Sequence, residues 1–237
     1  TVRSKSGHAS APPARTPIGI LAKAVCAVES KPFRFHMAGP AREMFDILGR
    51  HAGFGIKLVF ANLKLFSPLL RLATKKAGGE FNALVRTTVA FTKMKASDTV
   101  NVFPAAASVE ADVRMMEGDT RDSVIAALKQ RIGNDAVEIE ALNAIEVRPF
   151  SPIGTEPWQR LEEGIRQVWS GTLVAPYMIL ACTDSRHFTR ICPNVLRFCA
   201  MELSAQERKM IHGSNERIPL HKVETTVKFF TCMLLKS

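Results

Sequence analysis

The sequence predicts a mixed α/β fold that is divided into two parts. Segments in which apolar and polar residues alternate, as they do in half-buried strands, are interspersed with segments of helical periodicity. The hydrophobic fraction of 46% is large enough to form a core. Three prolines, Pro149, Pro152 and Pro157, follow the last alternating segment and indicate a boundary. We therefore expect one domain over residues 1–148 and a second over residues 149–237.

The first domain is expected to begin with a short strand at residues 1–6, followed by a helix at residues 17–30. Thr16 is suited to cap this helix, because its hydroxyl can accept a backbone N–H of the first turn. The helix is expected to end at Lys31-Pro32, since the residue before a proline disfavours helical backbone.

Residues 41–76 are strongly apolar and are expected to be helical, with a break near Pro68. Lys57, Lys64 and Arg71 recur every seven residues, which would stack them on one face of a helix. A charged stripe of this kind indicates an amphipathic helix and not a membrane span. Packing within its own domain, contact with a partner chain and a cover over the substrate are three open interpretations of this helix.

Two strands are expected next, over residues 82–95 and 100–115, and the second is interrupted at Pro104. A helix over residues 121–132 and a last strand over residues 137–145 complete the domain. The order strand, helix, two strands, helix, strand is the ferredoxin-like βαββαβ arrangement, and the long apolar helix is an insertion before its second strand.

The second domain is expected to be a partial α/β segment. Its predicted elements are a helix at residues 156–169, strands at residues 175–182 and 195–201, and a final helix at residues 219–235.

The formal net charge of +10 is compatible with an anionic partner such as nucleic acid or a membrane surface. The basic residues are scattered, however, without a run of five and without an aromatic-interleaved RNA-binding motif. We therefore expect no nucleic-acid partner and no transmembrane segment. Lipid or nucleic-acid binding is a third-ranked hypothesis based only on charge and the amphipathic helix. The chain begins at Thr1 without a methionine, so its localisation is left open.

The cysteines are widely spaced and no C-x-x-C occurs, so neither a disulfide framework nor a structural zinc knuckle is expected. The five are Cys26, Cys182, Cys192, Cys199 and Cys232.

Six short motifs occur in a fixed order along the chain. They are Ser6-Gly7-His8-Ala9-Ser10-Ala11-Pro12, Asn101-Val102-Phe103-Pro104, Asp112-Val113-Arg114, Gly118-Asp119-Thr120, Thr183-Asp184-Ser185-Arg186-His187 and Ile211-His212-Gly213-Ser214-Asn215-Glu216-Arg217-Ile218. The ordered set resembles the co-catalytic zinc exopeptidases of the aminoacylase and carboxypeptidase-S type, in particular the N-acyl-amino-acid hydrolase branch. The resemblance covers nearly the whole chain. It implies a lid domain that mediates dimerisation, followed by the C-terminal part of a zinc-exopeptidase catalytic domain.

Two histidines receive roles from this resemblance. His212 is expected to be a metal ligand, in a short polar loop from which an imidazole can reach into a cleft. His8 is expected to reach into the active site of the partner subunit and stabilise the developing oxyanion. Without the flanking motifs, the two would be interpreted as a surface-loop histidine and a turn histidine.

Four further residues match positions that bind substrate. Asn101 and Arg114 lie in the lid, and an ion pair between Arg114 and Asp112 or Glu117 is the competing interpretation. Thr183 and Arg186 are expected to bind the scissile carbonyl and the substrate carboxylate, since a guanidinium offers a two-pronged fork to a carboxylate.

The implied activity is hydrolysis of an amide or peptide bond to an amino acid with a free carboxylate, in a homodimer that uses two zinc ions. The substrate would be a small N-acyl amino acid or peptide. The family's His-x-Asp motif, bridging aspartate and Glu-Glu pair are not found in this sequence, and Ala181-Cys182 replaces the usual glycines. The alternative is a truncated, catalytically inactive dimerisation module of the same family.

Overall fold

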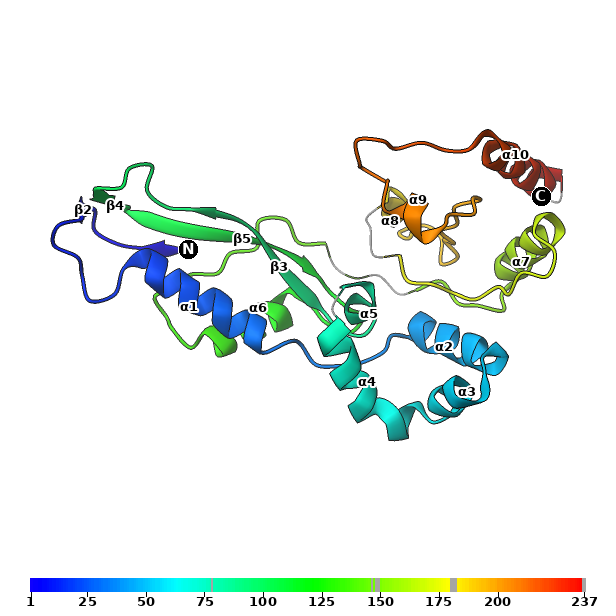
Figure 1. Cartoon of the computed structure of the whole chain (residues 1–237), viewed down its shortest axis with the longest axis horizontal. Coiled ribbons are helices and arrows are strands. Elements are labelled where there is room, and N and C mark those ends of the chain that lie inside the picture. The colour runs from blue at the N-terminus through cyan, green and yellow to red at the C-terminus, as the bar shows by residue number, and fades with distance from the viewer. Residues whose placement is uncertain (78, 146, 148–149, 180–182, 236–237) are drawn as a thin grey trace. The chain divides into compact units, whose positions relative to one another are not determined.

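The computed structural model describes the chain except residues 78, 146, 148–149, 180–182 and 236–237. The side chains of residues 64 and 75–77 are not described either. The chain forms two compact units, Thr1–Pro149 and Phe150–Ser237, which are described separately. The chain contains helices and small antiparallel sheets, which is the mixed fold class that the sequence predicts (Figure 1).

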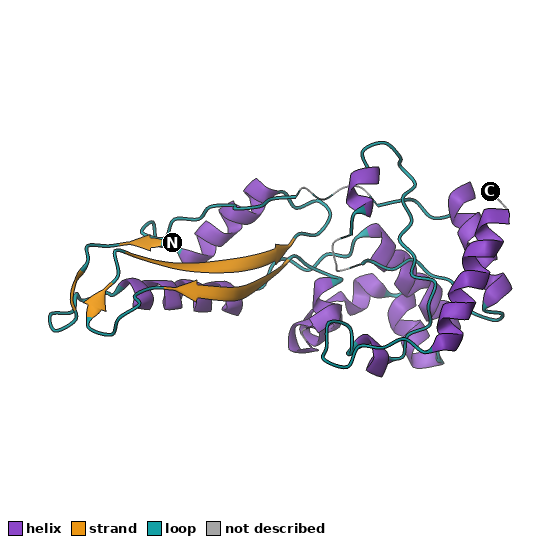
Figure 2. Cartoon of the chain, turned by 90° about the horizontal axis from the view of Figure 1, so that it is seen from above, coloured by secondary structure: helices purple, strands orange, loops and turns teal. Residues whose placement is uncertain are grey.

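The centre of the first unit is a long antiparallel strand pair. Strand β3 (Thr88–Lys95) pairs with β5 (Ala106–Arg114), so that Thr88 lies opposite Arg114 and Lys95 lies opposite Ser108. The register shifts between Phe91 and Lys93, which marks a β-bulge. Figure 2 shows this pair running along the length of the unit.

Strand β1 (Val2–Arg3) pairs with the other edge of β5, which gives the order β1-β5-β3. Val2 also forms an antiparallel bridge with Val137, and the amino group of Thr1 donates to the carbonyl of Glu138 at 2.8 Å. Residues around Val137 therefore occupy the place of the fourth strand in the ferredoxin-like arrangement. The expected strand over residues 137–145 is reduced to this bridge, because the two-residue β1 offers a partner to only a short stretch of backbone.

The remaining strand pair is formed by β2 (Gly7–His8) and β4 (Val102–Phe103). In Figure 1 it lies at the end of the first unit opposite to the helical insertion. The expected strand over residues 100–115 is thus divided at Pro104 into β4 and β5, because proline has no N–H to donate to a ladder.

Helices α1 (Pro17–Ser30) and α6 (Arg121–Ile132) pack side by side on the sheet. Leu21 and Ala24 of α1 are buried against Val2, Ala107 and Val137, which form the core of this unit. The burial of these apolar side chains is the main force that holds the helical layer on the strands.

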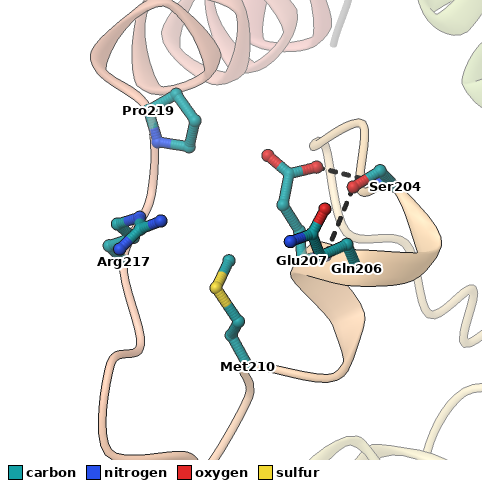
Figure 3. A pocket seen from close by; sticks show the side chains of 6 residues that line it. All are labelled: Ser204, Gln206, Glu207, Met210, Arg217 and Pro219. Atoms are coloured by element: carbon teal, nitrogen blue, oxygen red, sulfur yellow. Dashed lines mark hydrogen bonds between the residues drawn. The ribbon is translucent and has the colours of Figure 1, made fainter.

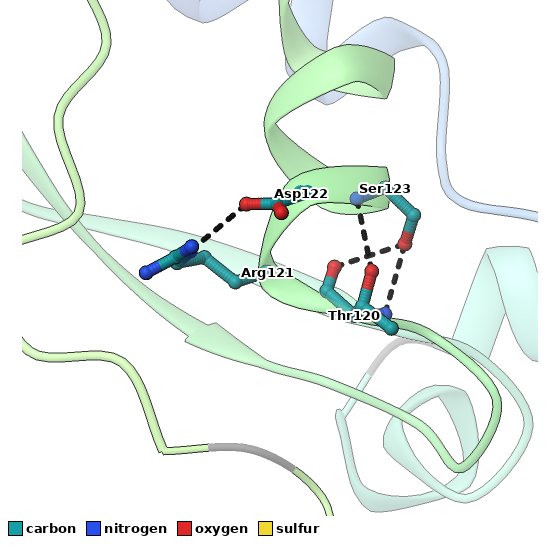
Figure 4. Close-up of polar contacts among 4 residues, drawn as sticks. All are labelled: Thr120, Arg121, Asp122 and Ser123. Atoms are coloured by element: carbon teal, nitrogen blue, oxygen red, sulfur yellow. Dashed lines mark hydrogen bonds and ion pairs between the residues drawn. The ribbon is translucent and has the colours of Figure 1, made fainter.

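Both helices have the amino-terminal caps that their sequences favour. The Thr16 hydroxyl accepts the backbone N–H of Gly19 at 3.1 Å. Thr120 and Ser123 form a reciprocal capping box, in which each side-chain oxygen accepts the other residue's backbone N–H (Figure 4). These bonds satisfy donors that a helix leaves without an intrahelical partner.

The helical insertion consists of four helices: α2 (Gly39–His51), α3 (Phe54–Ala61), α4 (Leu63–Ala77) and α5 (Gly79–Ala83). The predicted break near Pro68 is wrong, because α4 continues through that residue. The chain breaks instead at Asn62, whose side-chain amide donates to the Leu58 carbonyl at 2.9 Å while its own carbonyl accepts the N–H of Phe66. Asn62 therefore ends one helix and begins the next.

The break at Asn62 also divides the predicted stripe of cations between two helices, since Lys57 belongs to α3 and Arg71 to α4. Helix α3 turns back on α2 at Gly49, where an added Cβ atom would come within 2.6 Å of Phe60 Cβ. The Phe45 and Phe60 rings stack across this contact, with centroids 5.0 Å apart. No helix in the described part of the chain is both long enough and apolar enough to cross a membrane.

Strand β3 begins at Thr88, later than the expected residue 82, because Asn82 and Ala83 belong to α5 and the buried Arg86 and Thr87 are held by side-chain hydrogen bonds. The Arg86 guanidinium is buried and donates to the Thr74 hydroxyl at 3.0 Å. Burial, together with the nearby Arg71, lowers the pKa of Arg86. The Thr87 hydroxyl donates to the Asp119 carboxylate and accepts the Met116 N–H.

The second unit is built on α7 (Glu156–Val168) and α10 (Leu220–Leu235), joined by segments that carry the short helices α8 (Ser185–Phe188) and α9 (Ala205–Arg208). Its core contains Ile165, Ala200 and Phe229, and the Trp169 and Phe198 rings pack on Phe229. An added Cβ atom at Gly164 would lie 2.5 Å from Met233 Sδ, so glycine permits the close approach of α7 and α10.

The strands expected at residues 175–182 and 195–201 are not formed in the described residues, and residues 180–182 lie outside them. A strand needs a neighbouring strand to pair its backbone groups, and the described part of this unit offers none. The apolar pattern of these segments is therefore not sufficient to form a sheet in this chain.

Replacing Thr120 with alanine removes one side-chain acceptor of the capping box. We expect Thr120→Ala to lower the free energy of unfolding of the first unit by about 1 kcal/mol. Urea unfolding followed by circular dichroism measures the change, and hydrogen exchange of the amides in α6 localises it. Thr99→Ala, at an exposed turn, is the control and should leave both unchanged. Equal effects of the two substitutions would show that the cap contributes nothing specific.

Candidate functional site

His8 and Asn101 are brought together at the tip of the first unit, although they are 93 positions apart in the sequence. His8 lies opposite Val102 in the β2–β4 pair, and the N–H of Ala9 donates to the Asn101 carbonyl at 2.9 Å. Both His8 and Asn101 are exposed. The β2–β4 strand pair therefore brings the backbones of His8 and Asn101 into neighbouring positions at an exposed end of the first unit.

The hydrogen bonds of His8 determine its tautomer. Its Nδ1 accepts the backbone N–H of Ser10 at 3.1 Å and lies 2.8 Å from the Ser10 hydroxyl. A ring nitrogen that accepts an N–H carries no proton, so the proton of the neutral imidazole is on Nε2. His8 therefore offers an outward N–H donor whose orientation is fixed by its own turn.

Arg114 is separated from this pair by the length of β5. It lies opposite Thr88 at the far end of the strand, about 26 Å from Ala106 for eight residues of extended chain. Its Nε is 2.7 Å from Asp112 Oδ1, so the ion pair that competed with a binding role is formed. The structure does not bring Arg114 together with His8 and Asn101 within one copy of the lid.

Thr183 and Arg186 lie at the start of α8 in the second unit. The Thr183 hydroxyl is hydrogen-bonded to that of Ser185, which also accepts the Nε–H of Arg197. Arg186 is half-buried and directs its own Nε–H at His187 Nε2, at 3.3 Å. The Arg197 guanidinium therefore binds this pair of hydroxyls, whereas the Arg186 guanidinium is bonded to His187. A guanidinium is a group suited to bind a carboxylate or another anion.

Sequence analysis did not single out Ser185 as a contact or Arg197 at all. Arg197 is brought to Ser185 from a segment 12 positions further along the chain, and no periodic pattern connects the two. Ala181-Cys182, which replaces the expected glycines, lies outside the described residues.

His212 lies in a loop between α9 and α10. The base of this loop is closed by an ion pair between Glu207 and Lys222, whose nitrogen and oxygen are 2.6 Å apart and whose side chains are 17% and 13% exposed. Glu207 Oε2 also accepts the backbone N–H of Ser204 at the start of α9 (Figure 3). Through its ion pair with Lys222, the same carboxylate joins α9 to α10.

The backbone of this loop is strained at the candidate ligand. His212 has φ of 63°, which makes it a non-glycine residue in the left-handed region. Its N–H donates to Glu216 Oε2 at 3.3 Å, and the N–H of Gly213 donates to the Met210 carbonyl at 2.8 Å. At Gly213 an added Cβ would lie 3.0 Å from that carbonyl oxygen. Positive φ at a non-glycine residue is enriched at functional sites.

A cleft of about 310 Å³ opens beside this loop (Figure 3). It is lined by Ser204, Gln206, Glu207, Met210, Arg217 and Pro219. Hydrogen bonds from Lys222 and from Ser204 lower the pKa of Glu207 to about 2, so this carboxylate is ionised at neutral pH.

The described residues do not fit a metal centre by themselves. No group of three or more His, Cys, Asp or Glu side chains in the described part of the chain is arranged to hold a metal ion. His212 alone cannot bind a zinc ion that requires three or four ligands.

The sequence of the first unit matches a known domain family. Residues 1–140 match the M20 peptidase dimerisation domain. The chain belongs to the M20 family. The expected resemblance to aminoacylase and carboxypeptidase-type enzymes is thereby confirmed.

Several curated proteins match nearly the whole length of the chain. It is 35% identical over its whole length to an N-fatty-acyl-amino acid synthase/hydrolase of Xenopus tropicalis, of which it covers 46%. It is 34% identical over 96% of its length to the mouse protein of the same name, again covering 46% of that protein. A probable carboxypeptidase S-like protein of Dictyostelium discoideum is 33% identical over 94% of the chain, and the chain covers 43% of that protein. The chain thus spans less than half the length of these relatives. No solved structure matches it.

The low pKa of Glu207 predicts how the second unit responds to acid. The pKa is lower in the folded state than the ordinary 4.5, so the stabilisation is present above pH 4.5 and is lost as the pH falls through about 2. Both tryptophans, Trp158 and Trp169, lie in this unit, so fluorescence reports its unfolding selectively. We expect stability to decrease between these two pH values, and Glu207→Gln to remove most of the decrease.

The control is Glu202→Gln, at an exposed carboxylate of the same segment. It should retain the pH dependence of the unsubstituted chain. If Glu202→Gln flattened the profile as much as Glu207→Gln, the ion pair with Lys222 would not be its source.

Proposed function

We propose that this chain is the lid and the C-terminal catalytic segment of a zinc-dependent hydrolase. The bond cleaved is an amide or peptide bond to an amino acid with a free carboxylate. The observation that carries the proposal is the M20 match over residues 1–140 in a chain whose relatives are named as N-fatty-acyl-amino acid synthase/hydrolases and carboxypeptidase S-like proteins. One name describes the hydrolysis of an acyl-amino acid and the other a carboxypeptidase, and both support this choice of bond.

The geometry supports a division of roles within this proposal. His8 presents an Nε2–H donor, which is the group that stabilises a developing oxyanion. Asn101 lies beside it and would bind the substrate. Both project from the tip of the lid, which favours action on the active site of a partner subunit in a homodimer.

The second unit would contribute the other contacts. Arg186, with Thr183 nearby, would bind the substrate carboxylate and carbonyl, and Arg114 would contribute from the lid. His212 would supply one zinc ligand, and the remaining ligands would come from outside this chain. When bound, the metal would polarise the carbonyl and activate water.

An inactive dimerisation module is the second candidate function. It is favoured by the absence of a group of three metal-binding side chains among the described residues. The module would retain the lid and its tip but would bind no metal. The two candidates differ in what the chain does when the missing ligands are restored.

The chain by itself should therefore bind zinc only weakly and hydrolyse no N-acyl amino acid, because a single histidine is not sufficient for a zinc site. A colorimetric zinc titration and a hydrolysis assay on N-acyl amino acids measure this. Tight stoichiometric zinc together with turnover would contradict it.

A chimera tests the separate roles of the two histidines. The N-terminal part of the Xenopus relative would precede this chain and supply the missing segment. We expect His212→Ala to lose at least one zinc ion. His8→Ala should keep the metal and lose about 3 kcal/mol of transition-state stabilisation, because an oxyanion donor acts only in the transition state.

Metal analysis and steady-state kinetics decide the outcome, with His51→Ala as a control at an exposed histidine of α2. Equal zinc loss in the His8 and His212 variants would refute separate roles. A chimera that folds and binds zinc but never turns over would favour the inactive module.

A further inference from the structure

Helix α4 exposes a row of leucines that its own unit does not cover. The side chains of Leu65, Leu69 and Leu72 are 73%, 58% and 53% exposed. Their spacing of four and three residues places them on one face of the helix. Phe66 and Leu70 lie on a different face and are half-buried, so the packing of α4 against its own unit does not use the leucine row.

Helix α3 exposes large apolar side chains as well. Phe54, Ile56 and Leu58 are 83%, 55% and 48% exposed. Single exposed apolar residues are normal on a soluble protein, but here six large ones occur within 19 consecutive positions. We call these six residues of α3 and α4 the apolar hairpin surface.

The same segment has an unusual charge. Residues 47–79 contain no Asp or Glu, although the chain has 22 acidic residues in total. The basic residues of this segment are Arg50, Lys57, Lys64, Arg71, Lys75 and Lys76. Lys57 and Arg71 are exposed, and they are adjacent in the sequence to Leu58 and Leu72 of the apolar hairpin surface. An apolar surface flanked only by cations is complementary to a partner that is both apolar and anionic.

We propose that the apolar hairpin surface docks on an anionic lipid–water interface. Leucine and phenylalanine side chains would enter the boundary between headgroups and acyl chains, and Lys57 and Arg71 would contact the anionic headgroups. Helices of 8 and 15 residues are too short to span a bilayer but can lie in its surface. This inference is independent of the proposed hydrolytic function.

Charge distinguishes this occupant from a second copy of the chain. A two-fold dimer through the apolar hairpin surface would place the same acid-free, cationic segment on both sides of the contact. Like charges that face each other across an interface disfavour association. An anionic interface instead gains from every exposed cation, to the extent that salt does not screen it.

Vesicle flotation of the full 237-residue chain tests the proposal. Vesicles of phosphatidylcholine alone would be compared with vesicles that contain phosphatidylserine as well. We expect binding to the anionic vesicles at low salt, weaker binding at high salt, and at least about tenfold weaker binding to the neutral vesicles.

Two variants separate the apolar and electrostatic contributions. Leu65→Ser/Leu69→Ser/Leu72→Ser should lower binding about a hundredfold, because exposed leucines contribute to the interface and not to the core. Its control carries serine at three exposed apolar positions elsewhere in the first unit, Met94, Val100 and Leu142.

Lys57→Gln/Arg71→Gln should lower binding to anionic vesicles about tenfold and leave binding to neutral vesicles unchanged. The matched control is Lys5→Gln/Lys95→Gln, at two exposed lysines outside the helical insertion. Circular dichroism would show that every variant retains its helix content, so that a loss of binding is not a loss of fold.

Three outcomes would overturn the proposal. The chain could fail to float with anionic vesicles at low salt, or the leucine variant could bind as tightly as the unsubstituted chain. The third outcome is that the unsubstituted chain binds no vesicle and is dimeric by light scattering, whereas the leucine variant is monomeric. This result would assign the surface to contact with a second copy of the chain.

Discussion

The antiparallel pairing of β3 with β5 is the constraint on which the arrangement of the first unit depends. Its register places Thr88 opposite Arg114 and Lys95 opposite Ser108. One end of this ladder leads through Pro104 to the tip that carries His8. At the other end, the buried Arg86 joins the strands to the helical insertion. A shift of register by one residue would turn each side chain of β3 to the other face and would separate both ends from their contacts.

The candidate site residues are held by local bonds that differ between the two units. In the lid, the turn at Ser10 fixes the imidazole of His8 through a backbone N–H. In the second unit, the Glu207–Lys222 ion pair closes the loop in which His212 adopts a left-handed backbone. The local bonds thus fix the imidazole of His8 and the backbone of His212.

The helical insertion and the tip that carries His8 lie at opposite ends of the first unit (Figure 1). Its inner side chains, such as Phe60 against Phe45, hold it to its own unit, whereas the leucine row of α4 is left uncovered. Docking of this surface on a lipid interface would therefore leave the His8 tip unobstructed, because the two lie at opposite ends of the β3–β5 ladder (Figure 1).

The sequence by itself determined the family, the mixed fold class and the cap at Thr16, because these depend on motifs and local pattern. It also determined the bounds of α1, α6 and α10 to within about one residue, because helix bounds depend on local periodicity. The roles of the six site residues stay predictions. Only the tertiary structure decided that the helix breaks at Asn62 and not at Pro68, and that residues 137–145 form one bridge. The same holds for the two apolar segments of the second unit, whose described residues form no strand. Each of these depends on which partner the backbone finds in space, and a linear pattern does not contain that information.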